Sequence, residues 1–254
     1  LFIALPRHAH ERLEKVIGYL GEEFVDIKVV PDLLQFMQLN PGIEDLDGLP
    51  IVNLSEGPLY GWNSLFKRFV DFTVSLFLLI AMSPVIIIIA IAVKLTSNGP
   101  VLYEQERIGL SGRHFTMYKF RTMFEGAEKK TGAVWAKKGD SRRTSIGVFL
   151  RKASLDELPQ FFNVLKGDMS IVGPRPERPV FVNDFKKSVY QYMLRQKMKA
   201  GITGWAQVNG WRGDSSLEKR IEYDLYYIEN WSLLFDLKIM WLTIWKGLIN
   251  KSAY

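Results

Sequence analysis

The longest apolar stretch of the chain covers residues 69–93 and contains one charged residue, Asp71, close to its start. At about 1.5 Å per helical residue, this stretch is long enough to cross a bilayer core of about 30 Å. Ser83 and Pro84 stand near its middle. An interior proline removes a helix hydrogen bond and clashes with the preceding turn. We therefore expect an apolar helix with a kink at Ser83 and Pro84.

Three arrangements suit an apolar run of this length: a straight membrane span, a re-entrant helix that enters and leaves on one face, and a buried core helix. Basic residues flank both ends, Lys67 and Arg68 before and Lys94 after. The positive-inside rule therefore assigns no orientation to a straight span. The run is too long and too uniformly apolar for an ordinary core helix. A re-entrant membrane helix accounts for both the kink and the charges, and we predict one over residues 61–95.

The residues before this run, 1–60, have the pattern of part of an α/β unit. Residues 2–5 and 24–30 favour strands, and residues 11–20 favour a helix. Residues 45–50 have turn chemistry and precede a short strand at residues 51–54. This region has no G-x-G-x-x-G phosphate loop, so we expect a structural or regulatory role for it. Because the chain opens directly on a strand, we also expect further sequence upstream of Leu1.

Residues 96–254 change to short apolar runs with interspersed charge, the pattern of a soluble domain of mixed helices and strands. Residues 101–103 and 115–120 favour a hairpin that turns at residues 109–112 and ends at Arg121. Helices are predicted over residues 147–152, 160–166, 183–199 and 217–230.

The final segment carries Trp231, Trp241 and Trp245 among apolar residues, with Lys238 and Lys246 as its basic residues before Lys251. Tryptophan with lysine on a helix is typical of a membrane interface. Packing against the core or against a second subunit explains the same pattern nearly as well.

The amino-acid composition limits the kinds of active site and of binding partner that the chain can have. The chain has no cysteine, which excludes disulfides, thiolate zinc sites and a cysteine nucleophile, and it has three histidines. Lys and Arg exceed Asp and Glu by 33 to 27, a formal charge of +6 that favours anionic partners such as phospholipid, nucleic acid or phosphorylated substrates. The basic residues gather around acids and do not form a continuous aromatic and basic stripe, so we expect no nucleic-acid partner. A membrane scaffold remains as a non-enzymatic alternative.

Two adjacent carboxylates, Asp156 and Glu157, are followed closely by Pro174, Arg175 and Pro176. A carboxylate can act as a nucleophile or metal ligand, and arginine offers phosphate oxygens a planar fork of donors on a backbone that the prolines restrict. This combination points to phosphoryl transfer. A scaffold gives no reason for it.

The local setting of the acidic pair allows two interpretations. Ser154 and Glu157 fit an S-x-x-E capping box, which makes both acids ordinary residues of a first helical turn. Pro159 argues against this, because it then falls where a backbone N–H is needed. A helix that starts at Asp156 tolerates Pro159, and its dipole would keep Asp156 ionised.

Cations are dense in the sequence around the acidic pair. A basic face in solvent or on anionic lipid explains many of them, whereas Arg175 between two prolines is pre-organised for a phosphate contact. The set comprises Lys119, Arg121, Arg142, Arg143, Arg151, Lys152, Arg175 and Arg178.

Four segments, residues 119–123, 151–160, 163–176 and 201–210, resemble the successive signatures of the bacterial sugar transferases, the monotopic polyprenyl-phosphate phosphoglycosyl transferases. The resemblance covers residues 65–254 and implies an α/β protein: a membrane-associated mixed α+β catalytic domain (96–254) behind a re-entrant membrane helix (61–95). Residues 1–60 are similar to the end of the Rossmann-like regulatory domain of longer members, which carry membrane helices further upstream.

The resemblance implies an enzyme in which Asp156 attacks the β-phosphorus of a UDP-sugar, expels UMP and carries the phosphosugar until undecaprenyl phosphate accepts it. It implies Mg²⁺ against Asp156 and Glu157 as an assisting base or supporting group. It places the protein at the bacterial inner membrane, among its lipids, with the catalytic domain facing the cytoplasm. A homodimer is left open. The substrate-binding residues implied are Lys119, Arg121, Arg151, Pro174, Arg175, Pro176 and Gln207.

The sugar specificity is inferred from residues 209–213 and 250–254. These segments most resemble the corresponding segments of the glucose-1-phosphate transferases that start exopolysaccharide synthesis. We therefore expect UDP-glucose as donor. Galactose-1-phosphate and N-acetylhexosamine-1-phosphate transfer are the alternatives within the family.

Overall fold

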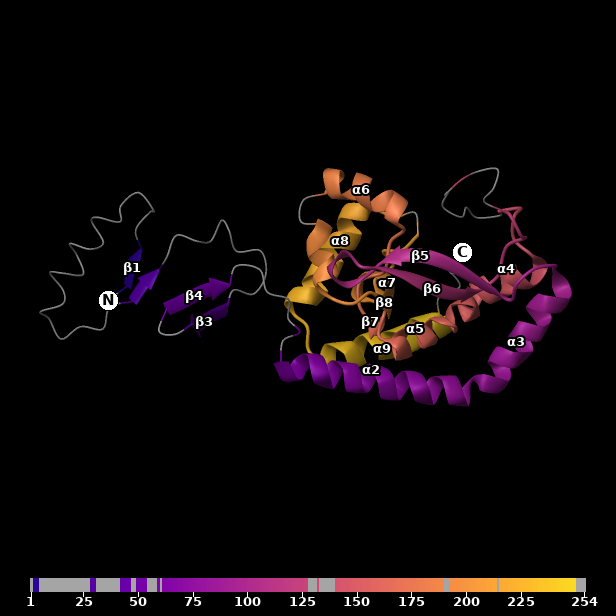
Figure 1. Ribbon diagram of the computed structural model, residues 1–254, viewed down its shortest axis with the longest axis horizontal. Coiled ribbons are helices and arrows are strands. Elements are labelled where there is room, and N and C mark those ends of the chain that lie inside the picture. Colours follow the sequence, from indigo (N-terminus) through magenta and orange to yellow (C-terminus); the bar gives the residue numbers. More distant parts are fainter. Residues whose placement is uncertain are drawn as a thin grey trace, which may run out of the picture. The chain divides into compact units, whose positions relative to one another are not determined.

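The computed structural model describes residues 2–4, 28–30, 42–46, 49–53, 59, 61–127, 132, 140–189, 192–213 and 215–249. The chain divides into two compact units, Leu1–Glu56 and Gly57–Tyr254. Helices and strands are mixed in it, as the sequence predicts (Figure 1).

In the first unit, β1 (Phe2–Ala4) pairs in parallel with β2 (Lys28–Val30). Strand β3 (Gly42–Leu46) pairs antiparallel with β4 (Leu49–Asn53), so residues 45, 46, 49 and 50 of the predicted turn belong to strands, and residues 47 and 48 lie outside the described residues. The predicted helix at 11–20, and residues 5, 24–27 and 54 of the predicted strands, lie outside the described residues. The Rossmann-like assignment stays a prediction.

The second unit begins with the apolar run, which forms α2 (Gly61–Ala81) and α3 (Ser83–Thr96), bent by 63° at the break (Figure 1). Pro84 has no N–H to give to the carbonyl of Ile80, four residues earlier. The hydroxyl of Ser83 donates to that carbonyl instead, at 2.8 Å. The serine thus satisfies the acceptor that the proline frees, which is why the pair breaks the helix without leaving a bare carbonyl.

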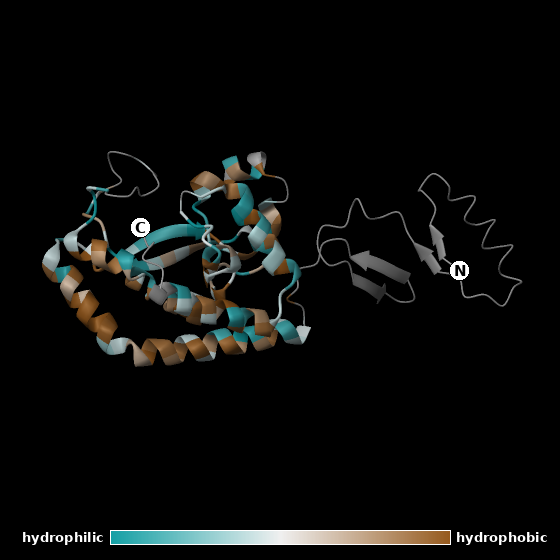
Figure 2. Cartoon of the chain, turned by 180° about the vertical axis from the view of Figure 1, so that it is seen from behind, coloured by the Kyte–Doolittle hydropathy of each residue, from teal (hydrophilic) through white to brown (hydrophobic). Residues whose placement is uncertain are grey.

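Helix α2 buries polar residues and exposes large apolar ones, the opposite of a helix on the surface of a water-soluble protein. Its buried stripe, at intervals of four residues, consists of Lys67, Asp71, Ser75 and Leu79. Lys67 donates to Asp236 at 2.7 Å, and Asp71 accepts from the backbone N–H of Ile171 at 3.1 Å. The polar stripe therefore holds α2 to the rest of the unit, while its large aromatic and aliphatic side chains are mostly exposed. Figure 2 shows how hydrophobic residues predominate along α2 and α3.

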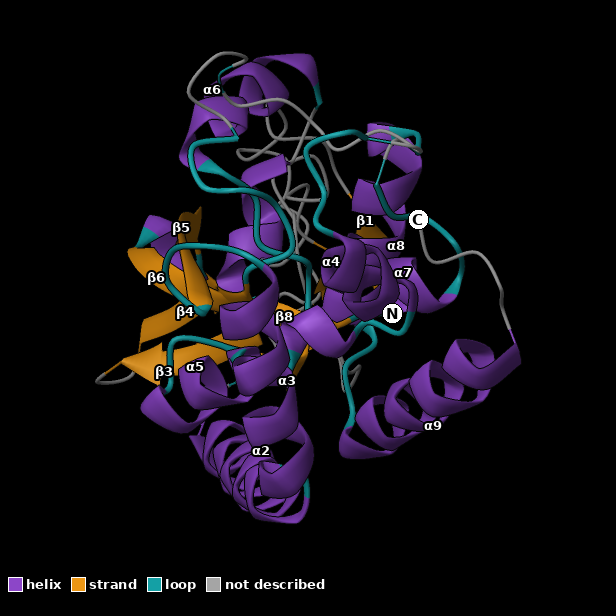
Figure 3. Cartoon of the chain, turned by 90° about the vertical axis from the view of Figure 1, so that its right-hand side faces the viewer, coloured by secondary structure: helices purple, strands orange, loops and turns teal. Residues whose placement is uncertain are grey.

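The remaining elements form small paired sheets covered by helices (Figures 1 and 3). Strands β5 (Leu102–Ile108) and β6 (His114–Phe120) make the predicted hairpin, with the short 3₁₀ helix η3 (Leu110–Gly112) in its turn, and β7 (Ser170–Val172) pairs in parallel with β8 (Gly201–Thr203). The helices are α4 (Ser145–Lys152), α5 (Gln160–Lys166), α6 (Pro179–Ser188), α7 (Trp205–Val208), α8 (Leu217–Glu229) and α9 (Leu233–Ile249), with 3₁₀ helices η4 (Leu155–Glu157) and η5 (Tyr192–Lys197).

One predicted helix is wrong. Residues 183–199 do not form a single helix, because α6 ends at Ser188 and Val189 is extended, after which η5 begins at Tyr192. Tyr192 is buried against Val182 and Ile221, so tertiary packing outweighs the helical pattern of this stretch.

Candidate active site

A cavity of about 500 Å³ opens beside the β5–β6 hairpin and the acidic pair. Its size suits a nucleotide-sized ligand. Basic side chains dominate its polar wall, which consists of Arg107, Lys119, Arg121, Arg151, Arg175, Arg178, Arg212 and Arg220 with Tyr103, Gln105, Thr122, Ser154, Asp156, Glu157, Glu177 and Gln207. Phe181 is one of its apolar lining residues. Five of the eight cations noted in the sequence line it, whereas Arg142, Arg143 and Lys152 do not.

The turn that carries Asp156 differs from both predicted settings. Ser154 adopts the left-handed conformation, with φ of 55°, and makes no side-chain cap. Asp156 and Glu157 lie on the 3₁₀ helix η4, and α5 begins only at Gln160, after Pro159. Neither the capping box nor a helix starting at Asp156 is correct, so a helix dipole is not what sets the charge of Asp156.

Glu157 is the ion-paired member of the acidic pair. Its Oε1 atom accepts from Lys119 Nζ, on β6, at 2.7 Å and from Arg175 Nη2, after β7, at 2.7 Å. Burial alone raises the pKa of this carboxyl, but Arg175 and Lys119 outweigh burial and hold the pKa below its usual range. Glu157 is therefore a fixed anion with an occupied oxygen.

Asp156 differs from its neighbour in pKa and in contacts. It is 8% exposed, and within the described part of the chain its carboxylate accepts no hydrogen bond. Burial, and then the negative charge of Glu157, raise its pKa to about 6, against the opposing effect of Lys119, Arg151 and Arg175. Asp156 is thus ionised at neutral pH while its lone pairs stay available for a reaction.

The other predicted site residues divide into two groups. Arg151 lines the cavity and its Nε donates to Thr122 Oγ1 at 2.8 Å, and Gln207 lines it with its Nε2 bound to the carbonyl of Ile202 at 3.2 Å. Arg121 reaches the cavity wall, but its guanidinium donates to the carbonyls of Ser97 and Asn98, at 2.8 and 2.6 Å. Arg121 therefore fastens the loop after α3.

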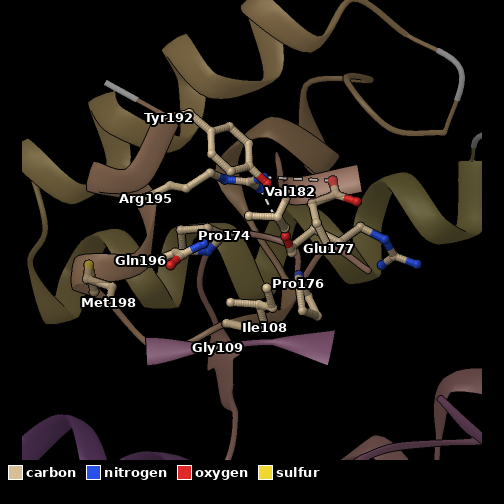
Figure 4. Close-up of a pocket in the computed structure, with 12 residues that line it drawn as sticks. Ile108, Gly109, Pro174, Pro176, Glu177, Val182, Tyr192, Arg195, Gln196 and Met198 are labelled. Carbon is tan, nitrogen blue, oxygen red and sulfur yellow. Dashed lines mark hydrogen bonds and ion pairs between the residues drawn. The ribbon is translucent and has the colours of Figure 1, made fainter. Parts of the chain in front are cut away.

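Pro174 and Pro176 lie behind the wall, beside a second cavity of about 20 Å³ (Figure 4). Such a volume has room for about one water molecule. The two prolines therefore shape the turn that carries Arg175 and are not in the wall of the large cavity.

Sequence reasoning missed several cavity residues, among them Tyr103, Gln105 and Arg107 on β5 and Phe181 on α6. The three on β5 alternate along the strand, so they share one face with Lys119, the register partner of Tyr103. Extending the predicted strand from residues 101–103 to 108 would have found them. Nothing comparable identifies Phe181.

Asp156→Asn is expected to raise the melting temperature in EDTA at pH 8 by a few degrees. Folding raises the pKa of Asp156 to about 6, above its value of 3.8, so the folded state binds this proton more tightly than the unfolded state. The ionised carboxylate therefore costs stability at high pH, up to about 3 kcal/mol, and the cost fades as the pH falls below 6. EDTA removes cations that would bind the carboxylate.

The matched control is Glu157→Gln, which should lower the melting temperature because it removes the charge that Lys119 and Arg175 pair with. Thermal unfolding at pH 8 and pH 5 checks both variants. A stabilisation by Asp156→Asn that is no smaller at pH 5 contradicts the assigned pKa.

Comparisons with known proteins agree with the family suggested by the motifs. A family model described as bacterial sugar transferase matches residues 62–250. The chain is 45% identical over 258 residues to a UDP-glucose:undecaprenyl-phosphate glucose-1-phosphate transferase of Klebsiella pneumoniae, and 44% identical over 258 residues to one of Escherichia coli K12, covering 100% of this chain and 55% of each relative. It is 42% identical over 204 residues to a UDP-N-acetylgalactosamine-undecaprenyl-phosphate N-acetylgalactosaminephosphotransferase of Aeromonas hydrophila, covering 80% of this chain and 47% of that relative. The chain spans about half the length of these curated relatives.

Proposed function

We propose that this chain, which belongs to the bacterial sugar transferase family, carries the active site that transfers glucose-1-phosphate from UDP-glucose to undecaprenyl phosphate and releases UMP. One observation carries the chemistry: of two adjacent carboxylates in a basic cavity, Glu157 is neutralised by two cations and Asp156 is not. The pair is therefore built for two different tasks.

In the first half-reaction, an Asp156 carboxylate oxygen forms a bond to the β-phosphorus of the UDP-sugar. The bond from that phosphorus to the bridging oxygen breaks, and UMP leaves with the electron pair. In the second, a phosphate oxygen of undecaprenyl phosphate attacks the same phosphorus and Asp156 leaves as a carboxylate. Polyprenyl-diphospho-sugar is the product, the first membrane intermediate of a surface polysaccharide.

The cations supply charge neutralisation, which phosphoryl transfer needs more than covalent help. Arg175 and Lys119 meet at Glu157 Oε1, and their positive charges also act on the Asp156 carboxyl, whose pKa they lower. Glu157 thereby orients both cations. Because its oxygen is already bonded twice, orientation suits it better than proton transfer.

Mg²⁺ is the cofactor that the residues fit best. No group of three or more His, Asp or Glu side chains converges among the described residues. Mg²⁺ in phosphoryl-transfer sites is held by one or two carboxylates together with substrate phosphates and waters, which requires no such group. Asp156, which is buried and accepts no hydrogen bond from the described residues, is the residue that would hold it. Bound there, Mg²⁺ would neutralise charge on the diphosphate oxygens.

Membrane attachment through α2 and α3 belongs to the same proposal. Among the described helices none alone has the length and apolarity to cross a bilayer, and the bent pair meets that requirement by length and composition only. Large apolar side chains make up most of its exposed face, which is costly in water and favourable in lipid. The exposed large apolar residues are Trp62, Leu65, Phe66, Phe69, Phe72, Leu76, Phe77, Ile80, Ile87, Ile88, Ile91 and Leu95.

Helix α9 supports the membrane proposal with a different pattern from the one expected. Leu234, Trp241, Ile244 and Trp245 are exposed. Lys238 is exposed as well, with its Nζ 5.5 Å from the centre of the Trp205 ring, whereas Lys246 donates to the carbonyl of Val208 at 2.6 Å. One lysine of α9 therefore accompanies its exposed apolar side chains, and the other is turned towards the protein. Both α2 and α9 lie at the lower side of this unit in Figures 1 and 3. We infer a re-entrant attachment to the inner membrane with the catalytic domain in the cytoplasm.

The test is UMP release by purified protein with undecaprenyl phosphate and Mg²⁺ across a panel of UDP-sugars. UDP-glucose should be turned over at least about tenfold faster than its galactose epimer or N-acetylated analogues, because a wrong hydroxyl leaves a buried polar group unpaired. Equal rates with glucose and galactose would refute the specificity and leave the reaction class intact. UMP release from none of them would refute the reaction.

The similarity to the Aeromonas protein keeps N-acetylhexosamine-1-phosphate transfer as the second candidate. Arg212 and Gly213, from the segment used to infer glucose, line the cavity, whereas residues 250–254 lie outside the described part. A preference for UDP-N-acetylgalactosamine in the same assay would select this alternative.

A further inference from the structure

Four charged side chains form a buried network that runs inward from the wall of the large cavity: Glu177 after β7 and Arg220 on α8, which line the cavity, and Arg195 on η5 and Asp224 on α8, which do not. Arg195 Nη2 lies 2.7 Å from Asp224 Oδ2, and Arg220 Nη1 lies 2.8 Å from Glu177 Oε1. Arg195 Nη1 lies 3.8 Å from the same Glu177 oxygen (Figure 4). Each of the four side chains is 3–5% exposed.

A network of this kind is an expensive way to stabilise a fold. The desolvation of buried charges offsets much of their attraction, so well-packed apolar residues serve stability as well or better. Two cations balanced by two anions do, however, fix the direction of each guanidinium fork, because the remaining N–H donors have few places to point.

The network also binds the backbone of the turn that carries Arg175. Arg195 Nη2 donates to the carbonyl oxygen of Arg175 at 2.9 Å. The two flanking carbonyls are bound as well, that of Pro174 by the N–H of Gly201 and that of Pro176 by Arg107 Nη1, both at 2.9 Å. The three carbonyls of the turn are therefore all held.

Close backbone packing completes the support. A Cβ atom on Gly201 would lie 2.1 Å from the backbone nitrogen of Gly173, so only glycine lets β8 approach the start of the turn. Arg220, the second arginine of the network, reaches another segment, because its Nη2 donates to the carbonyl of Gly213 at 2.6 Å. The network thus joins two walls of the large cavity, the Arg175 turn and the Arg212–Gly213 loop.

We propose that Arg195, oriented by Asp224, is a positioning residue that fixes the backbone of Arg175 so that its guanidinium meets both Glu157 and the donor diphosphate. Arg195 and Asp224 do not line the large cavity themselves, unlike Arg175, Glu177 and Arg220. Their effect on the reaction therefore passes through Arg175. The inference rests on the proposed transfer reaction and adds two residues, remote from the substrates, on which its rate depends.

The experiment is a double-mutant cycle of Arg195→Lys and Arg175→Ala, with UMP release measured from the UDP-sugar that the wild type uses fastest. Arg195→Lys should lower kcat about 10- to 100-fold with little change in KM, since a lysine cannot bridge Asp224 and the Arg175 carbonyl with the same fork. In the Arg175→Ala background the same change should cost less than about threefold, because the group it positions is gone.

Asp224→Asn gives an independent second variant, expected to repeat the kcat loss and the non-additivity. The matched control is Glu222→Gln, which breaks the exposed ion pair to Lys219 on the same helix and should leave the rate unchanged. Equal losses from Arg195→Lys in the wild-type and Arg175→Ala backgrounds overturn the positioning role, since a merely structural defect is additive. A wild type inactive with every UDP-sugar overturns the proposed reaction and this role with it.

Discussion

Asp156→Asn is expected to reduce UMP release by at least about 1,000-fold, because asparagine keeps the shape of the side chain and removes the nucleophilic charge. Both half-reactions should stop. In particular, exchange of labelled UMP into the UDP-sugar without any lipid acceptor should disappear, since that exchange requires the phosphosugar to be held on the protein. The measurement is label incorporation with Mg²⁺ and no undecaprenyl phosphate.

Glu157→Gln is the neighbouring control. Its amide oxygen can still accept from Lys119 or Arg175, but it cannot balance their charge. We expect a loss of about 10- to 100-fold with the exchange reaction retained. In wild-type protein trapped with UDP-glucose and digested, the added hexose-phosphate mass should lie on the peptide that contains Asp156. An active Asp156→Asn variant, or the mass on another peptide, would mean that Asp156 is not the nucleophile.

Cysteines introduced at Ser64 and Asn98 should both be labelled from the cytoplasmic side by a membrane-impermeant reagent. Both positions are exposed, one in the first turn of α2 and the other just after α3. The chain contains no cysteine of its own, so the background is clean. Labelling from opposite sides of inverted and right-side-out vesicles would contradict the re-entrant arrangement.

Pro84→Leu should move the Asn98 label towards the opposite side in a substantial fraction of molecules. Leucine supplies the backbone N–H that proline lacks, so the Ile80 carbonyl can accept the regular helical hydrogen bond in place of the one from Ser83, which favours one continuous helix long enough to span. Ile87→Leu, an exposed apolar exchange on α3, is the control and should leave both labels cytoplasmic. A Pro84→Leu variant labelled like the wild type would mean that the polar stripe of α2 decides the topology without the bend.

The elements with strong local signals were predictable from sequence. Ser83 and Pro84 mark the bend because a missing N–H acts on the helix that contains it, whatever surrounds it. The hairpin up to Arg121 and the helices α4, α5 and α8 follow from local periodicity in the same way. The prediction of a single helix over residues 183–199 is wrong because the chain breaks the helix to bury Tyr192, and that burial depends on tertiary packing.

The candidate site residues could also be predicted from sequence, since adjacent acids beside a Pro-Arg-Pro turn, within the family motifs, single out Asp156, Glu157 and Arg175. The different contacts of Asp156 and Glu157 could not be predicted. Lys119 and Arg175 are 38 and 18 residues from Glu157, and only the fold brings both to one of its oxygens. A helix dipole acting on Asp156 is one of the two interpretations that the local sequence allows, whereas in the structure burial and the charge of Glu157 raise its pKa.

The sequence by itself therefore determined which residues are the candidates for the chemistry and where the apolar helix breaks, because both depend on side chains that are neighbours in the chain. Only the tertiary structure decided which carboxylate is neutralised and which stays free, that Arg121 holds a loop, and that Arg195 and Asp224 support the Arg175 turn from behind. These are contacts between groups far apart in the chain. Their energies depend on burial and on distances of a few ångströms, which no local pattern encodes.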